Sequence, residues 1–332
     1  MPRECKDSPD QEENRDDIGT VDFESLDAVF QAGLLGTVVP ERLKYVSKPK
    51  AELTRSVKSN LTPHLARVFD VHTLKRMHNL DLILQVEELA ATIPNASGAI
   101  FSIANQLRRG WHFGQDVIQI KPVILTGPPG VGKTRLLRKI SATLGLHASI
   151  INVGGMVDAN VFGVSNGWGG ASPSCVTTAI ADATVLNPLI VVDELDKVRP
   201  GQNGDIYAEL LPLLEPSESH RWYEKFLAAE VNASHVSWVF TANSLAPIPS
   251  ALLSRCVVYE VQAPDQSQVR TILSSIVGDY ATEMNVDVRF LMLTSTDFEE
   301  LEATWPMHRS IRILTELTRQ VVDERQNAMP CA

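Results

Sequence analysis

Eight consecutive residues in the first half of the chain have the types and spacing of a phosphate-binding loop. They are Gly127, Pro128, Pro129, Gly130, Val131, Gly132, Lys133 and Thr134, which fit the pattern G-x-x-x-x-G-K-[ST] in full. Glycines let successive backbone N–H groups turn towards phosphate oxygens, and the N-terminus of a following helix adds partial positive charge. Lys133 is then expected to reach the β- and γ-phosphates of ATP, and the Thr134 hydroxyl to ligate Mg²⁺. The alternative is a glycine-rich turn that binds no ligand.

Two adjacent carboxylates follow an apolar run further along the chain. Asp193 and Glu194 come directly after Leu189–Val192. If that run is a strand of a parallel sheet, both acids lie at its carboxyl end, where such sheets bind ligands. Asp193 is then expected to complete the Mg²⁺ site, and Glu194 to orient and deprotonate the water that attacks the γ-phosphate. Two acids after a strand can also cap a helix, but the preceding phosphate loop favours the catalytic interpretation.

Short apolar runs alternating with helical patterns predict the elements that position these residues. The predicted strands are 123–126, 148–153, 189–192, 236–241 and 257–261. Continuous apolar strands separated by helices are typical of a parallel sheet covered on both faces, so we expect an α/β fold. Beyond Pro264 only amphipathic helical patterns remain, at 268–280 and 309–322, which predict a small helical lid.

The chain divides into four predicted parts. Residues 1–20 hold seven acids against three bases and predict a disordered acidic tail. Residues 21–115 predict a mostly helical extension, with helical periodicity from His72 to Leu107, a break at Pro94 and Ser97 as the N-cap of the next helix. Residues 116–263 are the expected nucleotide-binding core, and 264–332 the expected lid.

Composition excludes several classes of protein. Of the 332 residues 44% are hydrophobic, and 30 bases against 40 acids give a net charge of −10, which disfavours general nucleic-acid binding. Only the basic stretch 42–58 points towards an acidic partner or nucleic acid, and a solvated connector is the alternative. No apolar run approaches the roughly 20 residues of a membrane span, and the N-terminus resembles neither a secretory nor a transit leader. The four cysteines are scattered, which is typical of a reducing compartment, so we expect a cytoplasmic protein without membrane partners.

From residue 123 to 320 the chain resembles the AAA+ ATPases, and within them the ATPase module of Lon proteases. The matching order and spacing of motifs go well beyond a phosphate loop. The matches are GPPGVGKT (127–134), Val153-Gly154-Gly155 with Asp158, NPLIVVDELDK (187–197), LLPLLEPSES (210–219), Thr241-Ala242-Asn243, and Ile248-Pro249 followed by Leu252-Leu253-Ser254-Arg255. The resemblance implies an AAA+ P-loop NTPase with ATP and Mg²⁺ as cofactors.

The resemblance implies a catalytic role for three further residues. Asn243 matches the sensor-1 residue, whose amide positions the attacking water; a strand-end turn is the alternative. Arg255 matches an arginine finger that reaches a neighbouring subunit's nucleotide, although Ser254 replaces the family's Asp, and a surface ion pair is the alternative. Arg309 resembles the sensor-2 arginine, with Arg312 one turn later as its rival.

An aromatic residue in a glycine-rich loop matches a pore residue of the family. Trp168 lies five residues before Pro173 in the loop 165–173, and by resemblance it would line the central pore of a ring. The alternative is a Trp packed under its own loop. We expect Trp222, Tyr223 and Phe226 to be packing residues, and none of the eight histidines has metal-ligand spacing.

Together these features predict an ATP-hydrolysing protein that assembles into a homo-oligomeric ring, a hexamer by resemblance, and unfolds or remodels polypeptides. Because the sequence ends at Ala332, we expect no peptidase domain of the Lon type. Two alternatives are a DNA-associated AAA+ ATPase, for which the basic stretch is the sole support, and a nucleotide-dependent switch or scaffold. Stimulation of the ATPase by unfolded protein would favour the polypeptide-remodelling function. Salt-dependent binding to DNA would favour the DNA-associated ATPase.

Overall fold

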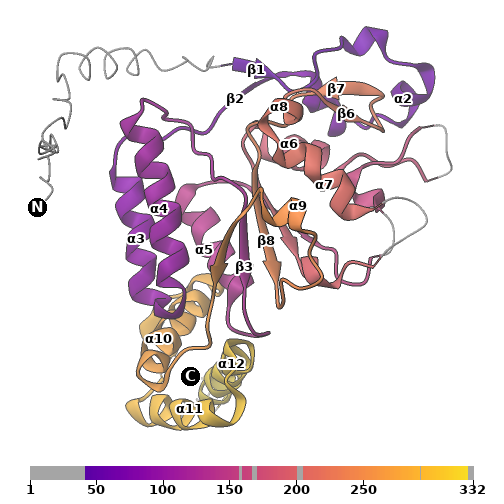
Figure 1. Ribbon diagram of the computed structural model, residues 1–332. Coiled ribbons are helices and arrows are strands. Elements are labelled where there is room, and N and C mark those ends of the chain that lie inside the picture. The colour runs from indigo at the N-terminus through magenta and orange to yellow at the C-terminus, as the bar shows by residue number, and fades with distance from the viewer. Residues whose placement is uncertain (1–41, 157–158, 167–169, 200–204, 292, 328–332) are drawn as a thin grey trace, which may run out of the picture. The chain divides into compact units, whose positions relative to one another are not determined.

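The computed structural model describes residues 42–156, 159–166, 170–199, 205–291 and 293–327 (Figure 1). The predicted tail at 1–20, Asp158 and Trp168 lie outside the described residues, so the interpretations attached to them stay predictions. Among the described residues, no helix combines the length and the apolar content that crossing a membrane requires.

A five-stranded parallel sheet forms the centre of the structure (Figure 1). Its strands occur in the order β4-β5-β8-β3-β9, and every neighbouring pair is parallel. The strands are β3 (Val123–Thr126), β4 (Ala148–Asn152), β5 (Leu189–Asp193), β8 (Ser237–Ala242) and β9 (Val257–Glu260). Each lies within one or two residues of a predicted strand, and the predicted α/β class with a parallel sheet is confirmed.

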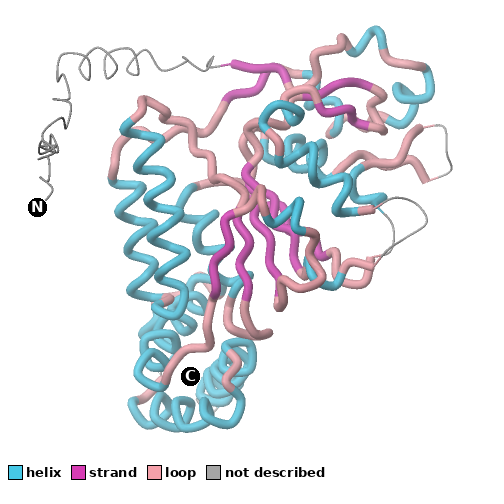
Figure 2. The backbone as a smooth tube through the Cα atoms, in the orientation of Figure 1, coloured by secondary structure: helices cyan, strands magenta, loops and turns pink. Residues whose placement is uncertain are grey.

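Successive side chains of each strand pack against helices on opposite faces of the sheet. Val123 and Leu125 of β3 pack on one face, here called the α5 face, with α3 (Asp81–Thr92), α4 (Ser97–His112) and α5 (Lys133–Leu144). Ile124 packs on the other, the α6 face, with α6 (Cys175–Ala183) and α7 (Ile206–Leu214). Figure 2 shows helices covering the sheet on both sides. Both faces are buried at the central strands β3, β5 and β8, which explains why these strands are apolar without alternation.

Residues before the sheet contribute to both apolar cores. Tyr45 and Val68 are fully buried on the α6 face, and the Tyr45 hydroxyl lies 3.0 Å from Thr177 Oγ1 of α6. Ile83 and Ile100 are buried on the α5 face. Residues on both sides of position 115 thus share the same two cores, and the described residues fall into one compact unit.

The helical prediction for 72–107 is partly wrong. The chain forms β1 (Arg42–Lys44), α2 (Arg55–Asn60) and β2 (Val71–Thr73) before α3 begins, and β1 pairs antiparallel with β2. His72 is therefore a strand residue, buried with its Nδ1 3.3 Å from Thr184 O. Ser97 is the first residue of α4 and not its N-cap, because Ala96 occupies that position and no side chain caps the helix.

One buried amide joins the N-terminal segment to the strand that carries the candidate acids. Asn187, fully buried before β5, accepts a hydrogen bond from Lys75 N (2.8 Å) and donates to Lys75 O (2.9 Å) and Ile118 O (2.8 Å). These bonds satisfy backbone groups that would otherwise be buried without partners.

The segment between β5 and β8 contains α7, α8 (Pro216–Ser219) and a hairpin of β6 (Trp222–Glu224) and β7 (Ala229–Val231). Fully buried Glu224 accepts hydrogen bonds from Ser174 N (2.8 Å) and Leu227 N (2.5 Å), and burial raises the pKa of its carboxyl group. The packing prediction is confirmed for Trp222 and Phe226, which are buried, and is wrong for Tyr223, whose side chain is 57% exposed on the other face of its strand.

Three α-helices follow β9 in the part of the chain that the structure describes. These helices are α10 (Gln266–Glu283), α11 (Ser295–His308) and α12 (Ile311–Asn327). A short helix, α9 (Ser250–Leu253), lies between β8 and β9. Their apolar faces form separate clusters, one of them around Leu273, Trp305 and Leu314. The sequence did not predict α11, because it buries only Asp297, Leu301 and Trp305 and carries a proline inside.

Candidate functional site

The predicted phosphate loop connects β3 to α5 at the carboxyl end of the sheet. Gly127 has φ +149°, and a Cβ added there would lie 2.1 Å from Val261 O, directly after β9. Gly130 and Gly132 also have positive φ, at +81° and +92°. The backbone at these positions favours glycine, and at Gly127 the neighbouring strand leaves no room for a side chain.

The Lys133 ammonium group lies buried inside this loop. Its Nζ donates to Gly127 O (2.7 Å), Pro128 O (2.9 Å) and Asn243 Oδ1 (2.9 Å), and the residue is 8% exposed. Burial lowers the pKa of Lys133; the carboxylates of Asp196 and Asp193 oppose that shift, and the cations Lys197 and Arg312 add to it. Lys133 and Asn243, to which the sequence analysis gave separate roles, are therefore in direct contact.

Thr134 and Asp193, the two residues expected to ligate Mg²⁺, are also in contact. Thr134 Oγ1, on the helix that follows β3, donates to Asp193 Oδ2 at the end of β5, at 3.3 Å. A hydroxyl and a carboxylate are hard oxygen ligands of the kind that Mg²⁺ takes, so the donor set fits that ion. Among the described residues, no cluster of three or more His, Cys, Asp or Glu side chains could hold a metal.

Thr241 is a site residue to which the sequence analysis assigned no role. Its hydroxyl donates to Asp193 Oδ1 and accepts a hydrogen bond from Glu194 N (3.1 Å). This side chain on β8 is therefore bound to the Asp193 carboxylate at the end of β5 and to the backbone N–H of Glu194, the next residue. The available signal was a polar residue in a continuous apolar run, and in the structure Thr241 is 1% exposed.

Glu194 has a left-handed backbone, with φ +62°, and its carboxylate turns towards Lys197. Lys197 Nζ donates to Glu194 Oε1, and this hydrogen bond is the main reason that the pKa of Lys197 is raised. Glu194 borders a pocket of about 530 Å³. Its other lining residues are Gly154, Gly155, Asp196, Lys197, Val198 and Arg199.

The N-terminus of α12 lies on the phosphate loop. Ile311 N donates to Gly130 O (2.8 Å), and a Cβ added at Gly130 would touch the Ser310 side chain. Arg312 is near enough to Lys133 to lower its pKa. Arg309 instead ends α11 as a left-handed C-cap with φ +45°, donating its N–H to Trp305 O (2.9 Å). It lies two residues before the last helix and not at its start.

Arg255 is held by an acid of its own chain. Its Nε lies 3.3 Å from Glu215 Oε2, and its Nη1 donates to Ala251 O (2.8 Å). The ion pair that the sequence left open as the alternative is thus present. Within the described part of the chain, Arg255 binds Glu215 and Ala251 and no residue of the phosphate loop, whereas Lys133, Thr134, Asp193 and Asn243 converge there.

Residues 123–262 match the family model described as ATPase family associated with various cellular activities (AAA). Similar curated proteins include a mitochondrial Lon protease homolog of Neurospora crassa, 33% identical over 209 residues that cover 61% of this chain and 19% of that protein. A Lon protease of Mycolicibacterium smegmatis is 36% identical over 140 residues, 42% of this chain and 18% of its own. The peroxisomal Lon protease homolog 2 of Mus musculus is 30% identical over 200 residues, which cover 58% of this chain and 22% of that protein. The chain spans about a fifth of the length of these relatives.

Substituting Gly127→Ala is expected to lower the free energy of unfolding by about 2–3 kcal/mol, because the new Cβ meets the backbone oxygen of Val261 directly after β9. Gly155→Ala is the matched control: φ there is +80°, but no atom of the described residues lies within 4 Å of the added Cβ, so only backbone strain of about 1 kcal/mol is expected. Urea titration followed by circular dichroism measures both. Equal losses in the two variants would contradict a steric requirement at Gly127.

Proposed function

We propose that this chain, which carries an AAA domain related to the ATPase region of Lon proteases, binds ATP together with Mg²⁺ and hydrolyses the γ-phosphate. The observation that carries the proposal is the convergence of four side chains from three adjacent strand ends. Lys133 and Thr134 follow β3, Asp193 ends β5, and Asn243 follows β8, and each contacts at least one of the others.

Lys133 is the phosphate-binding cation of this proposal. Its ammonium group donates hydrogen bonds to three uncharged oxygen atoms, two of them loop carbonyls, so its positive charge is not neutralised by these partners. Phosphate oxygens would replace them and stabilise the charged form, which burial disfavours. Thr134 and Asp193 would hold Mg²⁺, which would neutralise phosphate charge. Thr241 keeps the Asp193 carboxylate oriented for that task.

Glu194 is the proposed base, and Asn243 the residue that positions the attacking water. The carboxylate must first leave Lys197, since an acceptor oxygen bonded to an ammonium group is a weaker base. The Glu194 carboxylate would thus have two positions, one bound to Lys197 and one free to act on water. Exchange between them would link hydrolysis to the conformation of segment 194–199.

For the lid arginine, the contacts favour Arg312 over Arg309. Arg312 lies on the helix whose N-terminus touches Gly130, and its charge acts on Lys133. Arg309 has a structural task as the C-cap of α11. We therefore assign the sensor-2 role to Arg312, with Arg309 as the alternative.

Ring assembly with Arg255 acting on a neighbouring subunit is the second part of the proposal. It rests on the family's arrangement, since Arg255 in a single chain pairs with Glu215. Both side chains are about one-third exposed, so a nucleotide phosphate can compete for the guanidinium group. The ring would act on polypeptides, with Trp168 in its pore by resemblance.

Lys133→Ala is expected to abolish ATP binding, whereas Glu194→Gln should bind ATP and lose about 10²-fold or more in turnover, as for removal of a general base. Isothermal titration and phosphate release measure the two effects. Glu87→Gln, which removes a carboxylate that pairs with Arg108 on the α5 face, is the control and should keep full turnover. Near-normal turnover in Glu194→Gln would overturn the assignment.

Arg255→Ala is expected to lose about 10³-fold in turnover, the scale of an arginine finger. Mixing it with inactive Lys133→Ala protein should restore part of the activity, because mixed rings contain intact interfaces. Glu215→Gln frees Arg255 from its ion pair and should retain activity. If Glu215→Gln is as inactive as Arg255→Ala, or if confirmed mixed assemblies stay inactive, the role between subunits is refuted.

An unfolded protein is expected to stimulate the ATPase rate several-fold, whereas duplex DNA at the same mass should not, because the acidic chain repels a polyanion. A salt titration accompanies the DNA arm, since binding through phosphates weakens steeply with salt. Stimulation by DNA alone would favour the DNA-associated alternative, and no stimulation by either would favour a switch or scaffold.

A further inference from the structure

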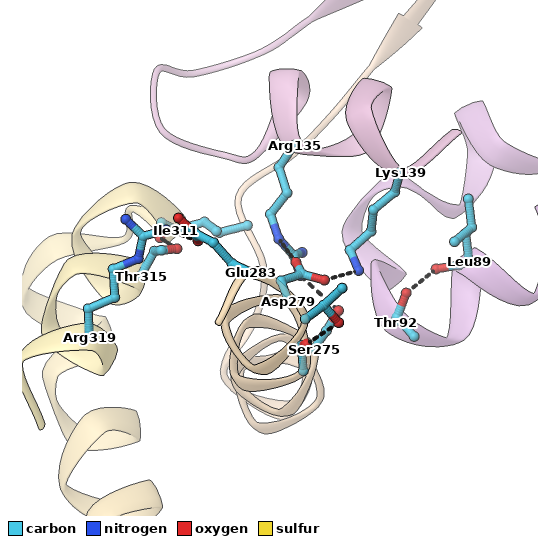
Figure 3. Close-up of polar contacts among 12 residues, drawn as sticks. Leu89, Thr92, Arg135, Lys139, Ser275, Asp279, Glu283, Ile311, Thr315 and Arg319 are labelled. Atoms are coloured by element: carbon cyan, nitrogen blue, oxygen red, sulfur yellow. Dashed lines mark hydrogen bonds and ion pairs between the residues drawn. The ribbon is translucent and has the colours of Figure 1, made fainter. Parts of the chain in front are cut away.

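A cluster of charged side chains joins the helix after the phosphate loop to the lid (Figure 3). Arg135 of α5 donates from Nε (3.0 Å) and Nη2 (2.6 Å) to Asp279 Oδ2 of α10, and Nη2 also donates to Ser275 Oγ (2.7 Å). Lys139 of α5 donates to the other oxygen, Asp279 Oδ1. One lid carboxylate thus binds two cations of α5, and both of its oxygens are occupied. We call these four residues the α5–α10 latch.

The latch lies next to the candidate phosphate and Mg²⁺ ligands in the chain. Arg135 directly follows Lys133 and Thr134, and Lys139 lies one helical turn further on, on the same face of α5. Asp279 is therefore bonded directly to side chains of the first two turns of α5, and no loop intervenes between these contacts and Lys133.

The lid touches the phosphate-binding segment at a second place. Ile311 N of α12 is bonded to Gly130 O, and the Ile311 side chain lies against Gly132. The two contacts come from different lid helices, α10 and α12, and hold the two ends of the segment 130–139. Both contacts are present together in this structure, so the lid is held on the loop at two points.

The charges make the latch sensitive to the loss of its acid. Arg135 and Lys139 are 18% and 23% exposed, and Arg135 Nη1 is buried without a hydrogen-bond partner among the described residues. Two N–H groups of Arg135 reach the same carboxylate oxygen of Asp279, and partly buried ion pairs are screened less than exposed ones. Without the Asp279 charge, two cations would face the lid with no compensating carboxylate, which disfavours the docked lid.

We propose that Asp279 is a positioning residue that holds the lid on the phosphate loop and thereby slows nucleotide release; for its effect on nucleotide, the inference rests on the proposed ATP binding. Asp279 acts through Arg135 and Lys139 and touches no nucleotide itself. The latch is made by the chain without ligand, so it has a consequence that can be measured in the absence of nucleotide.

The first test uses hydrogen–deuterium exchange of the full chain without nucleotide. Asp279→Asn is expected to increase exchange in α10 and in the first turns of α5. Asp323→Asn is the matched control: Asp323 accepts a hydrogen bond from Tyr280 within the lid, at 3.1 Å, and has no hydrogen bond or ion pair with a latch residue among the described residues. It should leave exchange in α5 unchanged. Unchanged exchange in Asp279→Asn overturns the latch, whether or not the protein binds ATP.

The second test measures dissociation of a fluorescent ADP analogue by stopped flow. Asp279→Asn is expected to release it about 5- to 10-fold faster, a typical coupling between two sites, while the chemical step in a single turnover changes little. Arg135→Gln should have a similar effect, and the double variant should be no faster than either single variant, because all three lack the same contact. Asp323→Asn should match the unaltered chain.

These outcomes separate the latch from the proposed function. If the unaltered chain does not bind the analogue, ATP binding fails, and the exchange experiment alone decides whether the latch holds the lid. If the analogue binds and Asp279→Asn releases it at the normal rate with α10 exchange raised, the positioning role is refuted. Additive acceleration in the double variant would show that the two residues act separately, which also refutes it.

Discussion

The ammonium group of Lys133 is the interaction on which the arrangement of the site depends. A charge that is 8% exposed must be surrounded by oxygen atoms, and the phosphate loop supplies two carbonyls only because its glycines let the backbone fold over the side chain. The third oxygen comes from Asn243 at the end of β8. The order β5-β8-β3 places that strand between the loop and the acids, so Asn243 and Thr241 join the phosphate-binding side of the site to the carboxylates.

The strands and the phosphate loop could be predicted because their signals are local. A strand buried on both faces is continuously apolar, and the loop needs glycine at fixed positions whatever the rest of the chain does. Lys133, Thr134, Asp193 and Asn243 meet as expected because parallel strands bring their carboxyl ends to one edge.

Features set by long-range contacts were missed. Helix α11 has too few buried residues for a clear helical period, and β1 and β2 pair across a segment whose sequence carries no hairpin signal. The choice between Arg309 and Arg312 depends on where α11 ends, and a left-handed C-cap at an arginine has no sequence signature. Thr241 illustrates the same limit, since its two partners lie on another strand.

The sharing of apolar cores across position 115 bears on how the protein can be divided experimentally. Tyr45 and Val68 pack on the α6 face of the sheet, and Ile83 and Ile100 pack on the α5 face. Asn187, just before β5, is hydrogen-bonded to the backbone of Lys75. A fragment cut to the family match at 123–262 would bare apolar surface on both sides of its sheet and lose the amide's partners. Such a fragment would be prone to aggregate on expression. The smallest piece suited to recombinant work is therefore set by core packing, and it begins well upstream of the segment that sequence comparison recognises.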